Sequence, residues 1–147
     1  EIHLVIAGQP GWLCQGIYRV IKKSPARDRI HFIGYVSEQD KPALYQNASL
    51  FVYPSFYEGF GFPPLEAASF GVPVMASAGS SFFETLGQGA LLVNPYDISE
   101  IASAMYQALT DSALRAMLSE KGKIAATKFS WEKEAKEILK IFEEIII

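Results

Sequence analysis

The sequence has little of several things that mark particular classes of protein. Its 147 residues include one cysteine, Cys14, and two histidines, His3 and His31. One cysteine excludes a disulfide framework within the chain, and so few cysteines and histidines give no ligand spacing for a structural zinc site. We therefore expect no bound metal, a structural role for both histidines, and a reducing, cytoplasmic location.

Charge of one sign and long hydrophobic runs are also scarce. The chain has 13 Lys and Arg against 16 Asp and Glu, a net charge of −3. No basic cluster marks a surface for nucleic acid, so we expect no nucleic-acid partner. No apolar run reaches the roughly 18 residues of a membrane-spanning helix, and no signal peptide opens the chain.

What the chain does have is apolar residues, and their pattern predicts an α/β fold. Half of the residues are hydrophobic, enough for one domain with a core. Short apolar runs alternate with helical patterns, as in a Rossmann-like parallel sheet with helices on both faces. The predicted strands are Ile2–Ala7, Arg29–Ile33, Leu50–Tyr53, Val72–Ser77 and Ala90–Val93. The predicted helices lie near Gly11–Lys23, Glu38–Gln46, Pro64–Phe70, Ile98–Leu109 and Ser112–Lys128, with Ser37, Asp97 and Asp111 as N-caps.

A last helix is predicted from Ser130 to the end of the chain. Its apolar residues recur at helical spacing and form one stripe. The stripe consists of Trp131, Ala135, Ile138, Leu139, Phe142, Ile145 and Ile146, with Ile147 beyond it. We expect this stripe to lie on an apolar surface and, where that surface is missing, to favour self-association.

The stretch "YPSFYEGFGFPPLEAAS", Tyr53–Ser69, predicts a loop between a strand and a helix. The strand is expected to end at its first proline, and the helix to begin at the pair Pro63 and Pro64, because a first helical turn tolerates proline. Such loops lie at the carboxyl ends of parallel strands, where α/β proteins bind ligands. Gly59 and Gly61 leave backbone N–H groups accessible beside a helix N-terminus, which suits the oxygens of a diphosphate.

Two carboxylates flank this loop. Glu66, in the first turn of the helix, could accept hydrogen bonds from a ribose diol, and Glu58 could hold the hydroxyls of a sugar. The residues alone fit a simpler interpretation equally well: a plain turn, one solvated glutamate and one that interacts with the helix dipole. A dinucleotide fingerprint fits less well, because "GFGFPP" lacks the third glycine.

At these residues the chain resembles a known family. The segments "HFIGYVSEQDKPALYQNASLFVYPSFYEGFGFPPLEAASFGVPVMAS", "ALLVNPYDISEIASAMYQALTD" and "FSWEKEAKEILKIFEEI" are similar to the C-terminal domain of retaining nucleotide-sugar glycosyltransferases of family 4, the glycosyl transferases group 1. The most specific element is the pair Glu58 and Glu66, separated by seven residues. The resemblance implies one half of a GT-B fold, in which two Rossmann-like domains face each other across a cleft.

The resemblance also implies which residues bind the donor. They are Gly59, Phe60, Gly61, Leu65, Glu66, Tyr35 and Val36, with Glu58 as the catalytic residue. The backbone of the glycine loop would contact the sugar and the diphosphate, with Leu65 beside the phosphates. Glu58 would contact sugar hydroxyls, Glu66 the ribose, and the loop "GYVS" the base. Tyr35 fits a packing residue at a strand end equally well.

The implied activity is transfer of a sugar from a nucleoside diphosphate sugar to an acceptor hydroxyl with retention of configuration, as in polysaccharide biosynthesis, with no metal or other cofactor. Residues 1–147 would then be the nucleotide-sugar-binding C-terminal domain. We expect it to lack its first strand–helix segment, which carries an Arg and a Lys in relatives, and the N-terminal acceptor-binding domain. Any peripheral membrane contact would go through that absent domain, and the 147 residues alone would be inactive. The alternative is a non-catalytic nucleotide-sugar-binding module, or a subunit that pairs with a separate acceptor-binding protein.

Overall fold

The structure is a computed structural model that describes residues 1–12, 14–79 and 81–145. The chain divides into two compact units, Glu1–Ala43 and Leu44–Ile147, and each is described by itself. Ile146 and Ile147 of the predicted apolar stripe lie outside the described residues.

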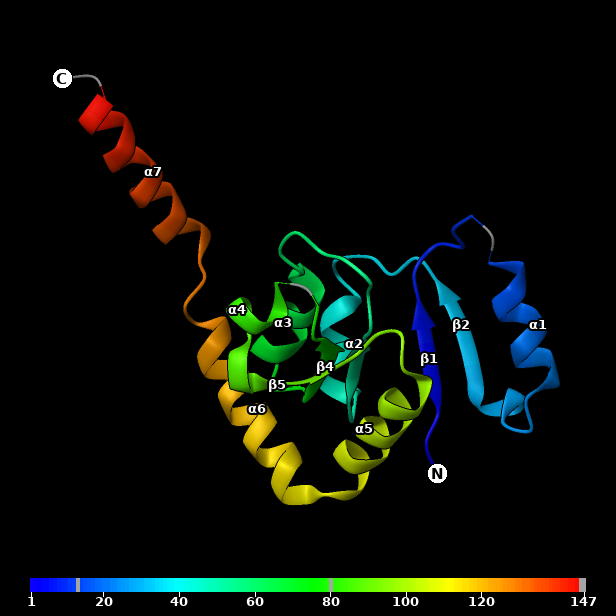
Figure 1. Cartoon of the computed structure of the whole chain (residues 1–147). Coiled ribbons are helices and arrows are strands. Elements are labelled where there is room, and N and C mark those ends of the chain that lie inside the picture. Colours follow the sequence, from blue (N-terminus) through cyan, green and yellow to red (C-terminus); the bar gives the residue numbers. More distant parts are fainter. Residues whose placement is uncertain (13, 80, 146–147) are drawn as a thin grey trace. The chain divides into compact units, whose positions relative to one another are not determined.

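The first unit is a β–α–β unit (Figure 1). Its elements are β1 (Leu4–Ala7), α1 (Gln15–Lys23), the 3-10 turn η1 (Arg27–Arg29) and β2 (Ile30–Gly34). β1 and β2 are parallel neighbours, with Leu4 opposite Ile30, as the alternating sequence pattern predicts. Tyr18 of α1 packs on Phe32 of β2, with ring centroids 4.7 Å apart.

The two strands of this unit are less buried than their apolar sequences predict. Leu4 and Val5 are 41% and 48% exposed. The reason is that the single α-helix of this unit can cover only one face of its two-stranded sheet. His31 lies in β2 as predicted, whereas His3 precedes β1. The two rings stack, and Nδ1 of His3 lies 2.9 Å from Nε2 of His31, so the ring just before β1 pairs with one in β2.

The second unit holds a three-stranded parallel sheet, in the order β3-β4-β5. The elements are α2 (Lys41–Asn47), which spans the division between the units, β3 (Phe51–Tyr53), α3 (Phe62–Ser69), β4 (Val74–Ser77), α4 (Phe82–Thr85), η2 (Gly87–Gly89), β5 (Ala90–Val93), α5 (Ile98–Thr110), α6 (Ser112–Ala126) and α7 (Trp131–Ile145). The predicted strands are all present. The short elements α4, η1 and η2 were not predicted, because a single turn shows no hydrophobic period.

Helices cover both faces of this sheet, which confirms the predicted fold class. All four residues of β4 are buried. Val74 and Ala76 pack in one core cluster with residues of α3, α4 and α6, whereas Met75 packs on the other face with Val93 and Ala104 of α5. Within the described residues, β1 and β2 form one ladder, in the first unit, and β3-β4-β5 form another, in the second unit.

Small residues bring α3 close to α6. A Cβ added at Gly122 of α6 would lie 3.3 Å from Cβ of Ala68 of α3, and a Cβ at Gly89 would lie 2.7 Å from Cα of Gly122. Such close approach fixes the position of α3, the helix that carries Glu66.

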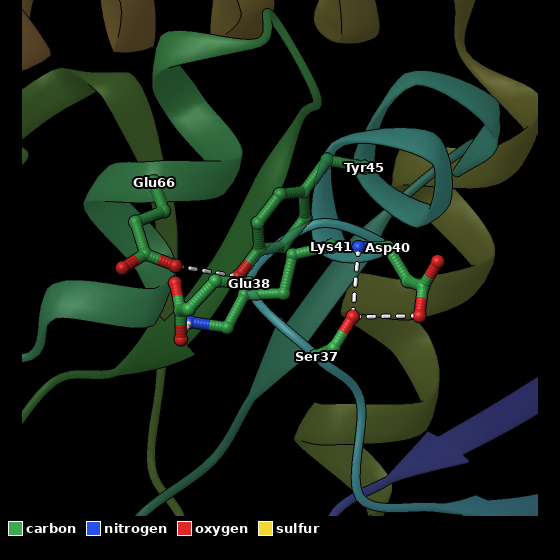
Figure 2. Close-up of polar contacts among 6 residues, drawn as sticks. All are labelled: Ser37, Glu38, Asp40, Lys41, Tyr45 and Glu66. Carbon is green, nitrogen blue, oxygen red and sulfur yellow. Dashed lines mark hydrogen bonds and ion pairs between the residues drawn. The ribbon is translucent and has the colours of Figure 1, made fainter.

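The predicted N-caps are confirmed at two helices. Asp97 accepts hydrogen bonds from the N–H groups of Ser99 and Glu100, and Asp111 accepts one from Leu114. Ser37 instead caps a turn before α2: its hydroxyl accepts from the N–H of Asp40 and donates to the carboxylate of Asp40 (Figure 2). The reason is that α2 begins one turn later than predicted, at Lys41.

The apolar stripe of α7 is exposed, which agrees with the expectation of an uncovered apolar patch in these residues. Ile138, Phe142 and Ile145 are 51%, 57% and 73% exposed. At the start of the helix Trp131 stacks on Phe62, with ring centroids 5.8 Å apart. None of the described helices combines the length and the apolar character that crossing a membrane requires.

Candidate functional site

The loop between β3 and α3, residues 54–61, is the candidate site. β3 ends at Tyr53, and α3 begins at Phe62 with Pro63 and Pro64 in its first turn, one residue earlier than predicted. The loop follows the carboxyl end of a parallel strand, where α/β sheets bind ligands. It is tied to the loop after β4, because the hydroxyl of Ser81 donates to the carbonyl of Phe60 over 2.8 Å.

The two glycines of this loop have different surroundings. Gly61 is the N-cap of α3, has a φ of +84°, and leaves no room for a side chain, because an added Cβ would lie 2.1 Å from Cε1 of Phe82. Gly59 is not in the left-handed region, and an added Cβ there would meet no heavy atom within 4 Å. Gly61 is therefore required by the fold, whereas Gly59 keeps the backbone open to a ligand.

The loop offers a row of backbone donors. The N–H groups of Gly59, Phe60 and Gly61 donate to none of the described groups. Pro63 and Pro64 have no N–H, so the first turn of α3 adds few donors of its own. An anion at this end of the helix would therefore be bound mainly by the loop backbone, with support from the helix dipole.

Glu58 is held by a tyrosine. The hydroxyl of Tyr53, the last residue of β3, donates to Oε1 of Glu58 over 2.9 Å. Burial, the hydrogen bond to Glu58 and the negative charge of that carboxylate together raise the pKa of the Tyr53 phenol to about 12, with burial as the largest cause. The phenol therefore stays protonated and holds the carboxylate beside the glycine loop.

Glu66 is held in the same way from another element. The hydroxyl of Tyr45 of α2 donates to Oε2 of Glu66 over 3.0 Å (Figure 2). Glu66 is half-buried on α3, whereas its neighbour Leu65 is 7% exposed and packs in the core. Leu65 could therefore reach a phosphate only with its backbone.

The other two predicted donor-binding residues lie in the first unit. Tyr35 and Val36 directly follow the carboxyl end of β2, the position that the sequence predicted for them. Tyr35 is 68% exposed and Val36 is half-buried. An aromatic ring so exposed is available to stack on a planar group, and the assignment of Tyr35 to the donor site stays a prediction.

Sequence reasoning missed the two tyrosines that hold the glutamates. Tyr45 lies 21 residues before Glu66, and no spacing rule connects the two. Tyr53 ends a strand five residues before Glu58, so it was interpreted only as an apolar strand residue. In the residues that the structure covers, no three His, Cys, Asp or Glu side chains gather as metal ligands would. That this protein needs no metal remains a prediction.

Known proteins share this fold and sequence. The chain matches the family "Glycosyl transferases group 1" over residues 1–125. It is 40% identical over 129 residues to O-antigen chain mannosyltransferase B of Escherichia coli, covering 88% of this chain and 34% of that protein. It is also similar to the structure of sucrose-phosphate synthase from Thermosynechococcus elongatus, with a TM-score of 0.88, 27% identity, and coverage of 98% of this chain and 38% of that one. Anabaena HepE in complex with UDP gives a TM-score of 0.87 at 21% identity, over 97% of this chain and 41% of that one.

The fold is thus that of one half of a GT-B glycosyltransferase. The chain belongs to the glycosyl transferases group 1, as its resemblance to that family indicated. It spans about a third of the length of the E. coli relative.

The different surroundings of the two glycines lead to a prediction about stability. Gly61→Ala should lower the free energy of unfolding by about 2 to 4 kcal/mol, because it adds left-handed backbone strain and a clash with Phe82. Gly59→Ala is the matched control and should change it by less than about 0.5 kcal/mol. Urea denaturation measures both values, and equal effects of the two changes would contradict the distinction.

The raised pKa of Tyr53 leads to a second prediction. The unfolded chain ionises this phenol near pH 10, and the folded chain near pH 12. The contribution that the protonated Tyr53 phenol makes to the stability of the fold is therefore complete below about pH 10. It is lost as the pH rises to about 12. The intact protein should lose more stability over this range than Tyr53→Phe, which cannot ionise. Denaturation midpoints across the range measure this difference, and parallel curves for the two proteins would refute it.

Proposed function

We propose that this chain is the donor-binding part of a retaining glycosyltransferase. It would bind a nucleoside diphosphate sugar, and the complete enzyme would transfer the sugar to an acceptor hydroxyl with retention at the anomeric carbon. Membership of the glycosyl transferases group 1 supports the general activity. The observation that carries the donor-binding role is the loop itself. Three backbone N–H groups that have no acceptor among the described residues lie between two carboxylates, and each carboxylate is held by a tyrosine.

The proposed chemistry follows from the position of these groups. The N–H groups of Gly59, Phe60 and Gly61 would bind the diphosphate and stabilise the charge that develops as it leaves. Glu66 would bind the ribose diol through its carboxylate. Glu58 would orient the sugar through its hydroxyls, so that the anomeric carbon faces the acceptor. Tyr35 and Val36 would border the base, and no cofactor is assigned.

The relatives suggest which donor to test first. The E. coli relative is named a mannosyltransferase, and Anabaena HepE, which shares the fold, was solved with UDP and with UDP-glucose. We therefore propose a nucleoside diphosphate mannose as donor and a growing polysaccharide as the class of acceptor. The acceptor would be bound by a separate domain of the complete protein, in the cytoplasm. Self-association through the exposed stripe of α7 is proposed for the 147 residues when that domain is absent.

The role of Glu66 can be tested by binding. Glu66→Ala should weaken the binding of a nucleoside diphosphate by about 1 to 3 kcal/mol, since a charged hydrogen-bond partner is lost. Glu100→Ala is the control, because Glu100 is a helical glutamate outside the candidate site. Glu100 lies in the first turn of α5, whereas Glu66, contrary to the sequence prediction, lies beyond the first turn of α3. Isothermal titration calorimetry measures both. If the two variants bind equally well, Glu66 does not hold the ribose.

The role of Glu58 can be tested by turnover of the complete enzyme. Glu58→Gln should lower kcat about tenfold or more, whereas the affinity for the free nucleoside diphosphate should stay within about twofold. The reason is that Glu58 would contact the sugar and not the nucleotide. Steady-state kinetics and calorimetry separate the two effects, and a parallel loss of both would show that the assignment is wrong.

The non-catalytic alternative makes a different prediction. A chain that covers about a third of its relative could serve as a binding module that pairs with a separate acceptor-binding protein. Such a module would bind the donor but support turnover only when that partner is added. Acceptor-dependent turnover by the protein as a single chain would exclude this alternative.

A further inference from the structure

Four aromatic side chains form a continuous row that leads away from the glycine loop. Phe60 lies between the two glycines, and Phe62 is the first residue of α3. Their ring centroids are 4.8 Å apart. Phe129 meets Phe60 edge-on at 5.3 Å, and Trp131, the first residue of α7, stacks on Phe62 at 5.8 Å. The row therefore connects the candidate donor loop to the start of the last helix.

The inner and outer halves of this row differ in burial. Phe60 and Phe129 are half-buried and pack against the core of the second unit. Phe62 and Trp131 are 50% and 79% exposed. The outer contact therefore contributes little to burial of the core, and removing it should leave the fold intact.

The loop depends on this row for its conformation. Phe60 has a glycine on each side, and glycine restricts the backbone less than any other residue. Three contacts with described residues hold it: Ser81 donates to its carbonyl, and Phe62 and Phe129 each contact its ring. The direction of the three N–H groups at residues 59–61 therefore depends on where this ring is held.

We propose that Phe129 and Trp131 are positioning residues for donor binding. They touch no donor atom themselves. Trp131 holds Phe62, Phe129 holds Phe60, and together they keep the N–H groups of the loop directed at the diphosphate. The start of α7 is thereby coupled to the donor site. This inference rests on the proposed function, because it assigns the loop to the diphosphate.

The chain offers well-matched variants for a test. Trp131→Ala removes the outer contact, Trp131→Phe restores an aromatic ring there, and Phe129→Leu removes the inner contact. Phe142→Ala is the control, because Phe142 lies on the same helix, is 57% exposed, and has no place in the row. Two quantities are measured in the intact protein: calorimetric affinity for nucleoside diphosphates with different bases, and NMR order parameters of the Gly59 and Gly61 amides after selective labelling with ¹⁵N-glycine.

We expect Trp131→Ala and Phe129→Leu to weaken nucleoside diphosphate binding about three- to tenfold, the range for one lost aromatic contact. They should also lower the order parameters of Gly59 and Gly61. Trp131→Phe and Phe142→Ala should leave affinity within about twofold and loop order unchanged.

Loop order that does not change in Trp131→Ala and Phe129→Leu would overturn the inference, whatever the affinities. So would lower loop order with unchanged affinity, because the row would then hold the loop without serving the donor. A different result would show that the proposed function is wrong. In that case the protein without any substitution would bind no nucleoside diphosphate, although Trp131→Ala still lowers the order parameters of Gly59 and Gly61. The coupling to donor binding would be overturned with it.

Discussion

The candidate site depends on the contact between one phenylalanine ring and one glycine. Phe82 is fully buried, and its ring fills the space beside Gly61 where a side chain would otherwise be. The same ring meets Tyr53 edge-on, with centroids 6.0 Å apart, and Tyr53 holds Glu58. One buried ring thus contacts both Gly61, the left-handed N-cap residue of α3, and Tyr53, whose phenol orients the carboxylate of Glu58. The site is built on the rigid core of the second unit, as preorganised binding sites require.

The arrangement of the two carboxylates favours the hydroxyl groups of a sugar over the oxygens of a phosphate. A free glutamate beside a glycine loop would repel a diphosphate as readily as it would bind a sugar. Here one oxygen of each carboxylate accepts a hydrogen bond from a tyrosine hydroxyl: Glu58 accepts from Tyr53, and Glu66 accepts from Tyr45. The hydrogen bond fixes the direction of the carboxylate, and carboxylate oxygens accept from hydroxyl donors. A ribose or a hexose offers such donors, whereas a phosphate oxygen does not.

The sequence predicted most of the fold, for physical reasons that can be named. The strands were recoverable because a buried parallel strand reads as a short apolar run, as in "PVMAS" around Val74. The caps at Asp97 and Asp111 followed from local side-chain chemistry. The burial of β1 was predicted wrongly, because the sequence pattern shows which residues are apolar and not what lies on them. The tyrosine partners and the role of Phe82 depend on contacts between distant segments, for which the sequence carries no local signal.

The central claim is that the glycine loop binds the diphosphate of a nucleotide sugar between the two held glutamates. A crystal structure of the intact protein with a bound nucleoside diphosphate sugar tests it most directly. The account predicts phosphate oxygens within hydrogen-bond distance of the N–H groups of Gly59, Phe60 or Gly61, with the ribose on Glu66 and the sugar on Glu58. A nucleotide bound elsewhere, with these N–H groups facing only solvent, would contradict it.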